Sequence, residues 1–225
     1  DAAEAARDAD IVSESIPEDP ELKGRVFRQF HELCPGHTIF TTNTSSLVPS
    51  MFAAQCGRPG RLIALHFHPP VWMATVADVM PHPGTEPEVT EITRQFAERI
   101  GQAPILLTRE HPGFVFNTML MSWIDSALRL VTRDICSIED VDRSWMGVMF
   151  APMGPFGVMD FIGLDTCYKV TEFWARKRGG ESAGRMVKLL KEKVDKGDLG
   201  MKSGKGFYTY PNPAYAAADF VKKKR

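Results

Sequence analysis

The chain has 225 residues, of which 44% are hydrophobic, and its 27 Lys and Arg nearly balance its 28 Asp and Glu, for a formal net charge of −1. A chain of this length can bury a sizeable core without disulfide or metal staples. The near-neutral balance excludes a broad nucleic-acid-binding surface, which would need clustered cationic charge. The one marked basic run, residues 222–225, is interpreted as a solvated tail.

Cysteine spacing and hydropathy bear on the cellular compartment. The four cysteines are widely separated and form no CxxC pair, which is typical of a reducing intracellular environment. No apolar stretch approaches the roughly 18 residues that a membrane span needs, and no apolar signal core follows the N-terminus. We therefore expect a cytoplasmic protein without a membrane partner.

Over the first hundred residues, short strand-like runs alternate with helical patterns, which is the signature of a parallel α/β sheet. One helix is especially well marked, because Asp19 is placed to cap its first turn and Pro20 suits its first position. The predicted strands cover residues 11–16, 38–42, 61–66, 76–80 and 104–108, and the predicted helices cover residues 20–34, 48–54 and 87–100.

The pattern changes after about Arg109. Apolar residues recur at helical spacing over residues 116–130, further helical stretches follow to residue 196, and strand-like alternation returns only at residues 206–210. We therefore divide the chain into an α/β domain at residues 1–108 and an α-helical domain at residues 109–225.

Two groups of polar residues directly follow predicted strands, where ligands bind in open α/β sheets. The first is Asn43–Ser46, and the second is the His-Phe-His run that begins at His66. His66 can serve as a general base near neutral pH, with Asp78 on the next strand fixing its tautomer. Asn117 can bring an amide to the junction of the domains. Alternatively, the first group is a turn with helix-capping hydroxyls, and the histidines are surface or core residues.

Five stretches of the chain occur in the order and at the spacing of one known family, and together they span nearly the whole sequence. They are Asn43–Leu47, Leu65–Pro70, Pro112–Asn117, Pro152–Gly157 with Asp160–Asp165, and Gly204–Tyr208. The chain thereby resembles the L-3-hydroxyacyl-CoA dehydrogenases, of the 3-hydroxybutyryl-CoA dehydrogenase type. One short match is a weak signal, whereas five in register are a strong one.

The resemblance implies a fold and an activity. The implied fold is the C-terminal part of a Rossmann-like NAD-binding domain, followed by an α-helical domain that forms a homodimer. The implied activity is the NAD-dependent oxidation of an L-3-hydroxyacyl-CoA to the 3-oxoacyl-CoA in fatty-acid β-oxidation or butanoate metabolism. In this reaction hydride passes to NAD, and a histidine takes the proton of the hydroxyl group.

The resemblance also assigns residues to roles. The catalytic positions are His66, Asp78, Asn117 and Ser45, the cofactor-binding positions are Glu18, Lys23 and Asn43, and no position is assigned to a metal. Of these, His66 is the general base, Asn117 helps to position the base and the substrate, and Ser45 contacts the reacting hydroxyl or carbonyl oxygen.

Two departures from the family pattern concern the same site. The usual His–Glu pair becomes His66 with Asp78, and because Asp reaches about one methylene less than Glu, we expect a shifted strand or a bridging water. The usual His-Phe-Phe-Asn-Pro run becomes His-Phe-His-Pro-Pro at residues 66–70, which removes an amide and adds an imidazole near the substrate. We therefore expect a substrate preference that differs from that of typical short-chain enzymes.

The dinucleotide fingerprint GxGxxG, which occurs in a βαβ unit of about 30 residues, is absent. The GxG at Gly204–Gly206 lies far downstream and opens no helix. In the family the fingerprint lies upstream of the position that corresponds to Asp1, so we expect the chain to lack the first half of the cofactor domain. Without that segment's helix N-terminus for the pyrophosphate, the chain is expected to bind NAD weakly or not at all and to be inactive, while its helical domain still dimerises.

Two other functions remain open on the sequence. The first is the dehydrogenation of a free hydroxy acid, as in relatives that act on gulonate or carnitine. The second is a metal site built from His66, His68 and Asp78, with His82 as a further candidate, because an H-x-H pair at a strand end and a carboxylate suit zinc. The neighbouring prolines and the family resemblance explain the segment without a metal.

Overall fold

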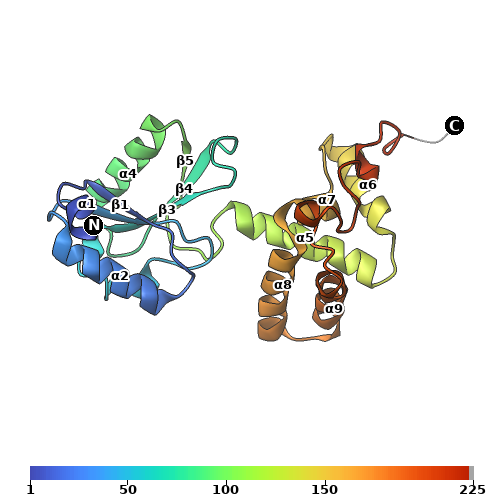
Figure 1. The fold of residues 1–225 in the computed structure, drawn as a ribbon, viewed down its shortest axis with the longest axis horizontal. Coiled ribbons are helices and arrows are strands. Elements are labelled where there is room, and N and C mark those ends of the chain that lie inside the picture. Colours follow the sequence, from blue (N-terminus) through green and yellow to red (C-terminus); the bar gives the residue numbers. More distant parts are fainter. Residues whose placement is uncertain (223–225) are drawn as a thin grey trace. The chain divides into compact units, whose positions relative to one another are not determined.

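A computed structural model describes residues 1–222 of the chain, apart from the side chain of residue 178. Residues 223–225, which complete the basic run that we interpret as a solvated tail, lie outside the described residues. The chain divides into two compact units, Asp1–Met119 and Leu120–Arg225 (Figure 1). Each unit has hydrophobic clusters of its own.

A five-stranded sheet forms the centre of the first unit, in the order β1-β2-β3-β4-β5. The strands are β1 (Ile11–Glu14), β2 (Ile39–Thr42), β3 (Leu62–Phe67), β4 (Val76–Pro81) and β5 (Ala103–Leu106). The helices are α1 (Ala2–Ala6), α2 (Pro20–Leu33), α3 (Ser50–Ala53) and α4 (Pro87–Arg99), with a short 3₁₀ helix at Pro59–Arg61. These elements confirm the predicted α/β architecture.

Helix α2 forms where local sequence signals favour it. The side chain of Asp19 accepts a hydrogen bond from the backbone N–H of Leu22 at 2.8 Å, which satisfies one of the N–H groups that a helix start leaves unpaired. Pro20 occupies the first helical position, where a missing N–H costs nothing. The helix ends at Leu33, two residues before Pro35.

Helices α2 and α4 cover opposite faces of the sheet (Figure 1), and the strand side chains alternate between them. Phe40 and Leu62 pack with Phe27 of α2, whereas Ile39, the neighbour of Phe40 in β2, packs in the cluster of Val89 from α4. This alternation follows from the two-residue period of an extended strand. Because both faces are covered, β3 is apolar and buried from Leu62 to Leu65.

One strand departs from the predicted parallel sheet. Strands β1, β2 and β3 run parallel and β5 is parallel to β4, but β4 is antiparallel to β3. The connection from β3 to β4 covers only residues 68–75, whereas a parallel crossover needs a dozen or more residues. The chain therefore has to reverse here, and the reversal makes Asp78 the register partner of His66.

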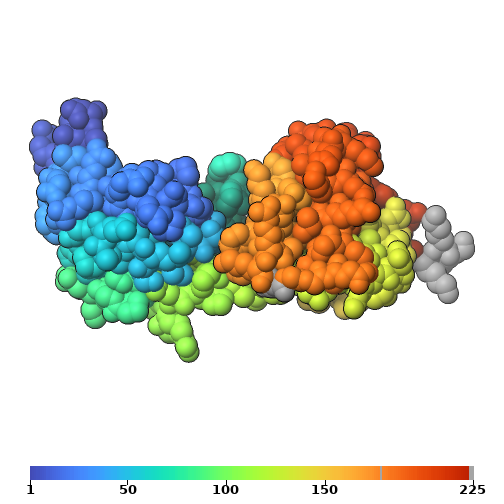
Figure 2. Space-filling view, turned by 90° about the horizontal axis from the view of Figure 1, so that it is seen from below, coloured from blue at the N-terminus to red at the C-terminus, as the bar shows by residue number. Residues whose placement is uncertain are grey.

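The second unit is predominantly helical. Helix α5 (Phe116–Thr132) begins in the first unit and continues into the second, which also contains α6 (Ile138–Met149), α7 (Pro155–Ile162), α8 (Leu164–Arg178), α9 (Glu181–Asp195) and 3₁₀ helices at Met201–Ser203 and Ala214–Ala216. The orange atoms in Figure 2 show the surface of α7, α8 and α9. Within residues 1–222, no helix is long and apolar enough to cross a membrane.

Residues 206–210, where the sequence alternates like a strand, do not form one. The segment takes part only in an isolated bridge between Lys205 and Thr209, next to a second bridge between Gly200 and Lys205. Its backbone N–H groups bind a carboxylate instead: Asp160 accepts hydrogen bonds from the N–H groups of Phe207 and Tyr208, at 2.8 and 2.9 Å. A buried side chain thus takes the place of a neighbouring strand.

Asp160 also explains the Gly204–Tyr208 stretch. Its side chain is fully buried and accepts a further hydrogen bond from the hydroxyl of Tyr210 at 3.0 Å. A Cβ atom on Gly206 would overlap the carboxylate of Asp160, so only glycine fits there. This family motif therefore serves the packing of the helical unit.

Asp142 of α6 performs the same task for α7. It is fully buried, and it accepts the N–H groups of Phe156 and Gly157, in the first turn of α7, at 2.9 and 3.0 Å. It also accepts the hydroxyl of Tyr208 at 2.9 Å. The carboxylate thus caps a helix whose N-cap, Gly154, offers no side-chain cap.

We expect Asp142→Ala to lower the free energy of unfolding by at least about 2 kcal/mol, because it leaves three buried donors without an acceptor. Urea unfolding followed by circular dichroism measures the change. The matched control is Asp195→Ala, which removes an exposed carboxylate paired with Lys191 and should cost under about 0.5 kcal/mol. Equal losses in the two variants would contradict the capping role.

Candidate active site

His66 and Asp78 face each other across β3 and β4. The Nδ1 atom of His66 lies 3.1 Å from Oδ2 of Asp78, and the two residues are only 4% and 1% exposed. A carboxylate can only accept hydrogen bonds, so His66 carries a proton on Nδ1. When the ring is neutral, Nε2 is left as the acceptor. The direct contact needs no bridging water, because the register of the antiparallel pair brings the shorter Asp side chain within reach.

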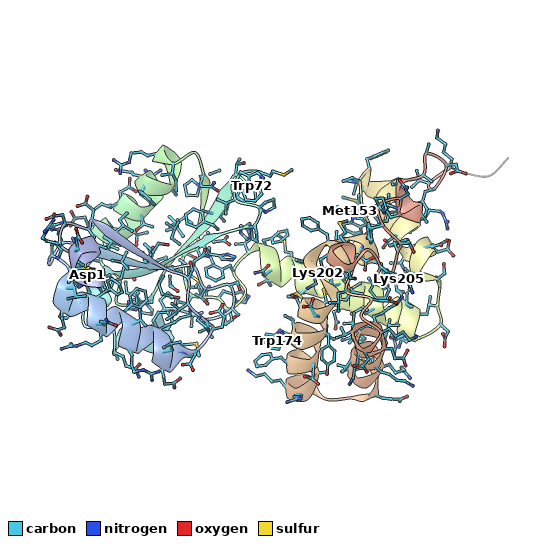
Figure 3. All side chains as sticks on the ribbon, in the orientation of Figure 1. Asp1, Trp72, Met153, Trp174, Lys202 and Lys205 are labelled. Carbon is cyan, nitrogen blue, oxygen red and sulfur yellow. The ribbon has the colours of Figure 1, made fainter. Side chains whose placement is uncertain are left out.

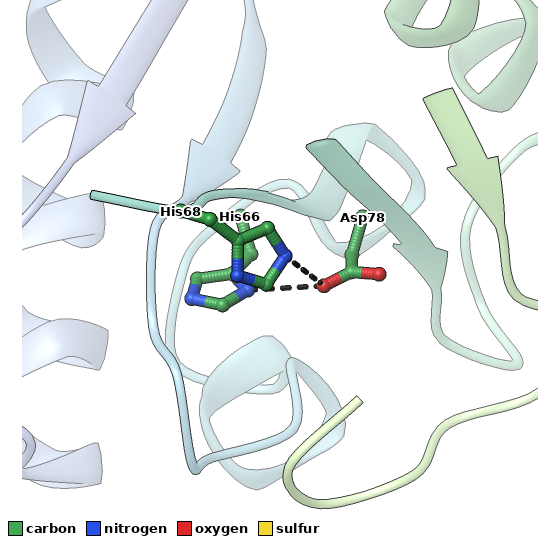
Figure 4. Close-up of side chains that lie close together, drawn as sticks. All are labelled: His66, His68 and Asp78. Atoms are coloured by element: carbon green, nitrogen blue, oxygen red, sulfur yellow. Dashed lines mark hydrogen bonds and ion pairs between the residues drawn. The ribbon is translucent and has the colours of Figure 1, made fainter. Parts of the chain in front are cut away.

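His68 donates to the same oxygen atom. Its Nε2 atom lies 3.0 Å from Oδ2 of Asp78, so that two imidazoles share one acceptor (Figure 4). The rings of His66 and His68 meet edge to face, with their centroids 4.6 Å apart. Both histidines project to one side because they are two residues apart in an extended segment.

The two histidines keep Asp78 ionised. Burial by itself would raise the pKa of this carboxyl, but the hydrogen bonds and charges of His66 and His68 outweigh burial, so that its pKa lies below the ordinary value. No lysine or arginine is among the groups that shift it. The negative charge of Asp78 is therefore balanced by imidazole protons.

Two phenylalanines form an apolar wall beside the histidines. The ring of Phe114 lies 4.8 Å from that of His66, and the ring of Phe116 meets that of His68 edge to face at 5.3 Å. Both belong to the Pro112–Asn117 stretch, which therefore contributes packing to the site. Asn117 is half-buried in the first turn of α5. Among the described residues, its amide makes no hydrogen bond with His66, His68 or Asp78.

A second polar cluster gathers around Glu18. The hydroxyl of Thr44 donates to both carboxylate oxygens, at 2.9 and 2.7 Å. The backbone N–H of Ser45 donates at 2.9 Å, and the hydroxyls of Ser45 and Ser46 lie at 3.4 and 3.2 Å. Burial would raise the pKa of Glu18, but these hydrogen bonds and the charge of Lys23 hold it below its ordinary value. The backbone N–H and the hydroxyl of Ser45 thus both contact Glu18.

Lys23 forms a buried ion pair beside this cluster. Its Nζ atom lies 2.7 Å from Oε1 of Glu14, with both side chains almost wholly buried, and 3.5 Å from Oε2 of Glu18. It also donates to the backbone carbonyl of Ile16 at 3.0 Å. Thr42 donates to the other oxygen of Glu14 at 2.7 Å. The charge of Lys23 is therefore already neutralised within the protein.

Sequence reasoning missed Glu14 and Thr42, whereas Thr44 lies within the predicted polar group Asn43–Ser46. Glu14 and Thr42 are the last residues of β1 and β2, and Thr44 follows shortly after. Their place at the carboxyl ends of parallel strands was a signal present in the sequence. Polar residues there contact ligands, or they position the residues that contact ligands. Asn43 stands between them, and its Oδ1 atom accepts the N–H of Phe67 at 2.9 Å, which ties the loop after β2 to the end of β3.

The candidate metal ligands separate into two places. Ligand atoms of His66, His68 and Asp78 all lie within 4.8 Å of one another. His82 follows the far end of β4, where its ring contacts the carbonyl of Pro59 at 2.8 Å and the N–H of Gly84 at 3.1 Å. His82 is therefore wrong as a member of this cluster, because three residues of strand separate it from Asp78.

Two family models match nearly the whole chain. The NAD-binding domain of 3-hydroxyacyl-CoA dehydrogenase matches residues 1–111, and the C-terminal domain of 3-hydroxyacyl-CoA dehydrogenase matches residues 113–210.

Individual proteins are similar over most of the chain. A probable 3-hydroxybutyryl-CoA dehydrogenase of Bacillus subtilis is 38% identical over 207 residues, covering 92% of the chain and 71% of that protein. Human mitochondrial hydroxyacyl-coenzyme A dehydrogenase is 32% identical over 210 residues, covering 93% and 67%.

Solved structures are similar over the same range. The structure of a diketoreductase that acts on dicarbonyl compounds is 39% identical with a TM-score of 0.86, covering 93% of the chain and 73% of its own. The (S)-3-hydroxybutyryl-CoA dehydrogenase of Ralstonia eutropha is 28% identical with a TM-score of 0.81, covering 94% and 74%.

We expect the stabilising effect of Asp78 to depend on pH. Because its pKa in the folded chain is lowered, the ionised carboxylate stabilises the fold at every pH above about 4, its ordinary range, and this contribution is lost as the pH falls through the folded value. Asp78→Asn should therefore unfold more easily than the wild type at neutral pH, and the difference should vanish in acid. Urea unfolding at a series of pH values measures it, and a difference that stays constant down to strong acid would contradict the assignment.

Proposed function

The chain belongs to the 3-hydroxyacyl-CoA dehydrogenase family, and from that premise we propose that it oxidises an L-3-hydroxyacyl-CoA to the 3-oxoacyl-CoA with His66 as general base. The observation that carries the proposal is the hydrogen bond from Nδ1 of His66 to Asp78. It leaves Nε2, the other ring nitrogen, to receive a proton.

The proton and the hydride of the substrate pass to two different acceptors. The hydroxyl proton moves to Nε2 of His66, and the resulting imidazolium is stabilised by the ionised carboxylate of Asp78. NAD, when bound, supplies the acceptor for the hydride from C3. The chain's own task is therefore to hold one neutral imidazole in one tautomer and orientation at the reacting oxygen.

Ser45 and Asn117 supply the remaining contacts in this proposal. The Ser45 hydroxyl is exposed and makes only a long contact of 3.4 Å with Glu18, so it is free to turn toward the reacting oxygen. Asn117 belongs to the same stretch as the phenylalanines that pack on the histidines. Its NH₂ group would donate to the substrate, and its oxygen would accept from Nε2 of His66 once that nitrogen has taken the proton.

The groups around β1 and β2 fit a dinucleotide cofactor in chemistry and place. Glu18 is ionised and its side chain is 38% exposed, so it would accept hydrogen bonds from sugar hydroxyls. Asn43 uses its oxygen on Phe67, which leaves its NH₂ group to donate to an amide or hydroxyl of the cofactor. Lys23, whose charge is neutralised by Glu14, would position Glu18 and not contact the cofactor itself.

A second candidate function is the conversion of a substrate without coenzyme A. The supporting observation is the 39% identity to a diketoreductase that acts on dicarbonyl compounds, next to the departure at His68 and Pro69 from the family pattern. Free hydroxy acids of the gulonate or carnitine type belong to the same alternative. All these substrates share a hydroxyl or carbonyl group at the reacting carbon, so His66 would have the same role.

A homodimer through the helical unit completes the proposal. Four large apolar side chains are exposed near the end of α6: Trp145, Val148, Met149 and Phe150, of which Phe150 is 93% exposed. A second copy of the chain would remove them from water.

We also propose a cytoplasmic location from the cysteine spacing, although a human relative is named as mitochondrial.

Replacing the base tests the reaction directly. In the protein with its complete cofactor domain, His66→Ala should lower kcat about 10²- to 10⁴-fold for 3-hydroxybutyryl-CoA, because it removes the group that takes the proton. The rate is followed by the absorbance of NADH. His37→Ala is the matched control, since His37 also pairs with an aspartate, Asp10 at 3.1 Å, but on the surface. Wild-type turnover in His66→Ala would overturn the proposal.

A substrate panel separates the two candidate functions. We expect kcat/KM for 3-hydroxybutyryl-CoA to exceed that for free 3-hydroxybutyrate, gulonate and carnitine, and for a dicarbonyl compound in the reducing direction, by at least about tenfold. This ratio corresponds to about 1.4 kcal/mol of binding energy from the coenzyme A portion in the transition state. A preference for a free acid or a dicarbonyl compound would instead support the second candidate.

The dimer is tested by charging its proposed surface. Val148→Asp combined with Phe150→Asp should shift the molar mass measured by light scattering from two chains to one, because two buried carboxylates cannot be paired there. Trp72→Ser is the control, since Trp72 is 84% exposed on the β3–β4 connection of the first unit (Figure 3). A mass that is unchanged by the double substitution would place the contact elsewhere.

A further inference from the structure

The histidine cluster holds more ligand atoms than a proton transfer needs. His66 Nδ1 and His68 Nε2 lie 3.1 and 3.0 Å from the same oxygen of Asp78, and within residues 1–222 this is the one group of three histidine, cysteine or acidic side chains close enough to hold a metal ion.

The charge around the cluster suits a cation. The ion-pair partners of Asp78 are the two histidines, and among the described residues no lysine or arginine pairs with it. The carboxylate therefore has no fixed positive partner, and a metal ion can take the place of the two imidazole protons that it now accepts. A buried carboxylate with a permanent cation beside it, such as Glu14 with Lys23, could not exchange its partner for a metal ion in this way.

We propose that His66, His68 and Asp78 form a binding site for a divalent transition-metal cation of the Zn²⁺ type, and that the bound cation switches off the general base. Two imidazoles and one carboxylate are the ligands of a three-residue zinc site with one open position. The His68 side chain is 12% exposed, against 5% for His66 and 2% for Asp78, so the ion enters, and a water completes its coordination, on the His68 side.

The inhibition follows from the tautomer of His66. A neutral imidazole carries one proton, which now sits on Nδ1 and points at Asp78. A metal ion bound through the Nδ1 lone pair requires that proton to move to Nε2. Nε2 is the atom that accepts the substrate proton in the proposed function, on which this consequence rests. The metal-bound form is therefore inactive, and removal of the ion restores the base.

Binding is measured first, without any enzymatic activity. The metal-free 225-residue chain is dialysed against ZnCl₂, and bound zinc is counted by atomic absorption, with the affinity taken from calorimetry. We expect one Zn²⁺ per chain, and at least about tenfold weaker binding for His68→Asn, which removes one ligand and leaves the His66–Asp78 pair. His37→Asn should bind as the wild type does, because His37 and Asp10 offer only two ligands on the surface.

A second measurement does not depend on a variant that folds. Co²⁺ in a four-coordinate site absorbs visible light more strongly than hydrated Co²⁺, so titration of the wild-type chain with CoCl₂ should produce this absorption and ZnCl₂ should abolish it. Less than half an equivalent of bound Zn²⁺, or equal affinity in the wild type and a folded His68→Asn, would overturn the site.

The activity of the wild-type enzyme then tests the switch. Saturating ZnCl₂ should reduce turnover at least about tenfold, and EDTA should restore it. Stoichiometric binding that leaves turnover unchanged would overturn the switch. If the chain binds Zn²⁺ as expected but the protein with its complete cofactor domain turns over none of the substrates in the panel, the proposed function has failed and the metal site stands, so the two failures are distinguishable.

Discussion

One oxygen atom of Asp78 receives hydrogen bonds from both His66 and His68, and the site depends on the strand reversal that makes this possible. The connection between β3 and β4 is too short for a parallel crossover, so β4 pairs antiparallel with β3 and Asp78 comes to lie opposite His66. In this register an aspartate reaches the imidazole directly. The reversal thus determines which tautomer His66 adopts, and with it which ring nitrogen can take a proton or a metal ion.

The buried carboxylates of the two units have different kinds of hydrogen-bond donors. In the first unit each buried carboxylate meets a hydrogen-bond donor that itself carries or can carry positive charge: Lys23 beside Glu14, and the two histidines beside Asp78. In the second unit Asp142 and Asp160 are surrounded by neutral donors, backbone N–H groups and tyrosine hydroxyls, and burial raises the pKa of both carboxyls. Asp78, whose pKa is lowered by its two histidines, stays ionised and available for chemistry, whereas Asp142 and Asp160 hold segments of the helical unit together.

The five stretches that identify the family have two different structural roles. Asn43–Leu47 and Leu65–Pro70 provide polar groups at the ends of β2 and β3. Pro112–Asn117 places Phe114 and Phe116 against the histidines. Pro152–Gly157 and Gly204–Tyr208 are instead explained by the two buried aspartates that bind their backbone. A motif can therefore identify the family strongly and serve the packing of the fold.

The sequence by itself determined the α/β-to-helical order of the chain, the positions of most helices and strands, the family, and the pairing of His66 with Asp78. The first two follow from local signals, namely apolar periodicity and the Asp19 cap with Pro20. The family and the histidine–aspartate pairing follow from residue types at strand ends and from the resemblance of five stretches to a known family. Only the tertiary structure decided that β4 is reversed, that residues 206–210 bind Asp160 in place of a strand, and that His68 shares the carboxylate while His82 lies apart. It also decided which partners Glu14 and Thr42 find. Each of these outcomes depends on which segments meet in space, and local propensity carries no information about the partner that a strand or a buried side chain will find.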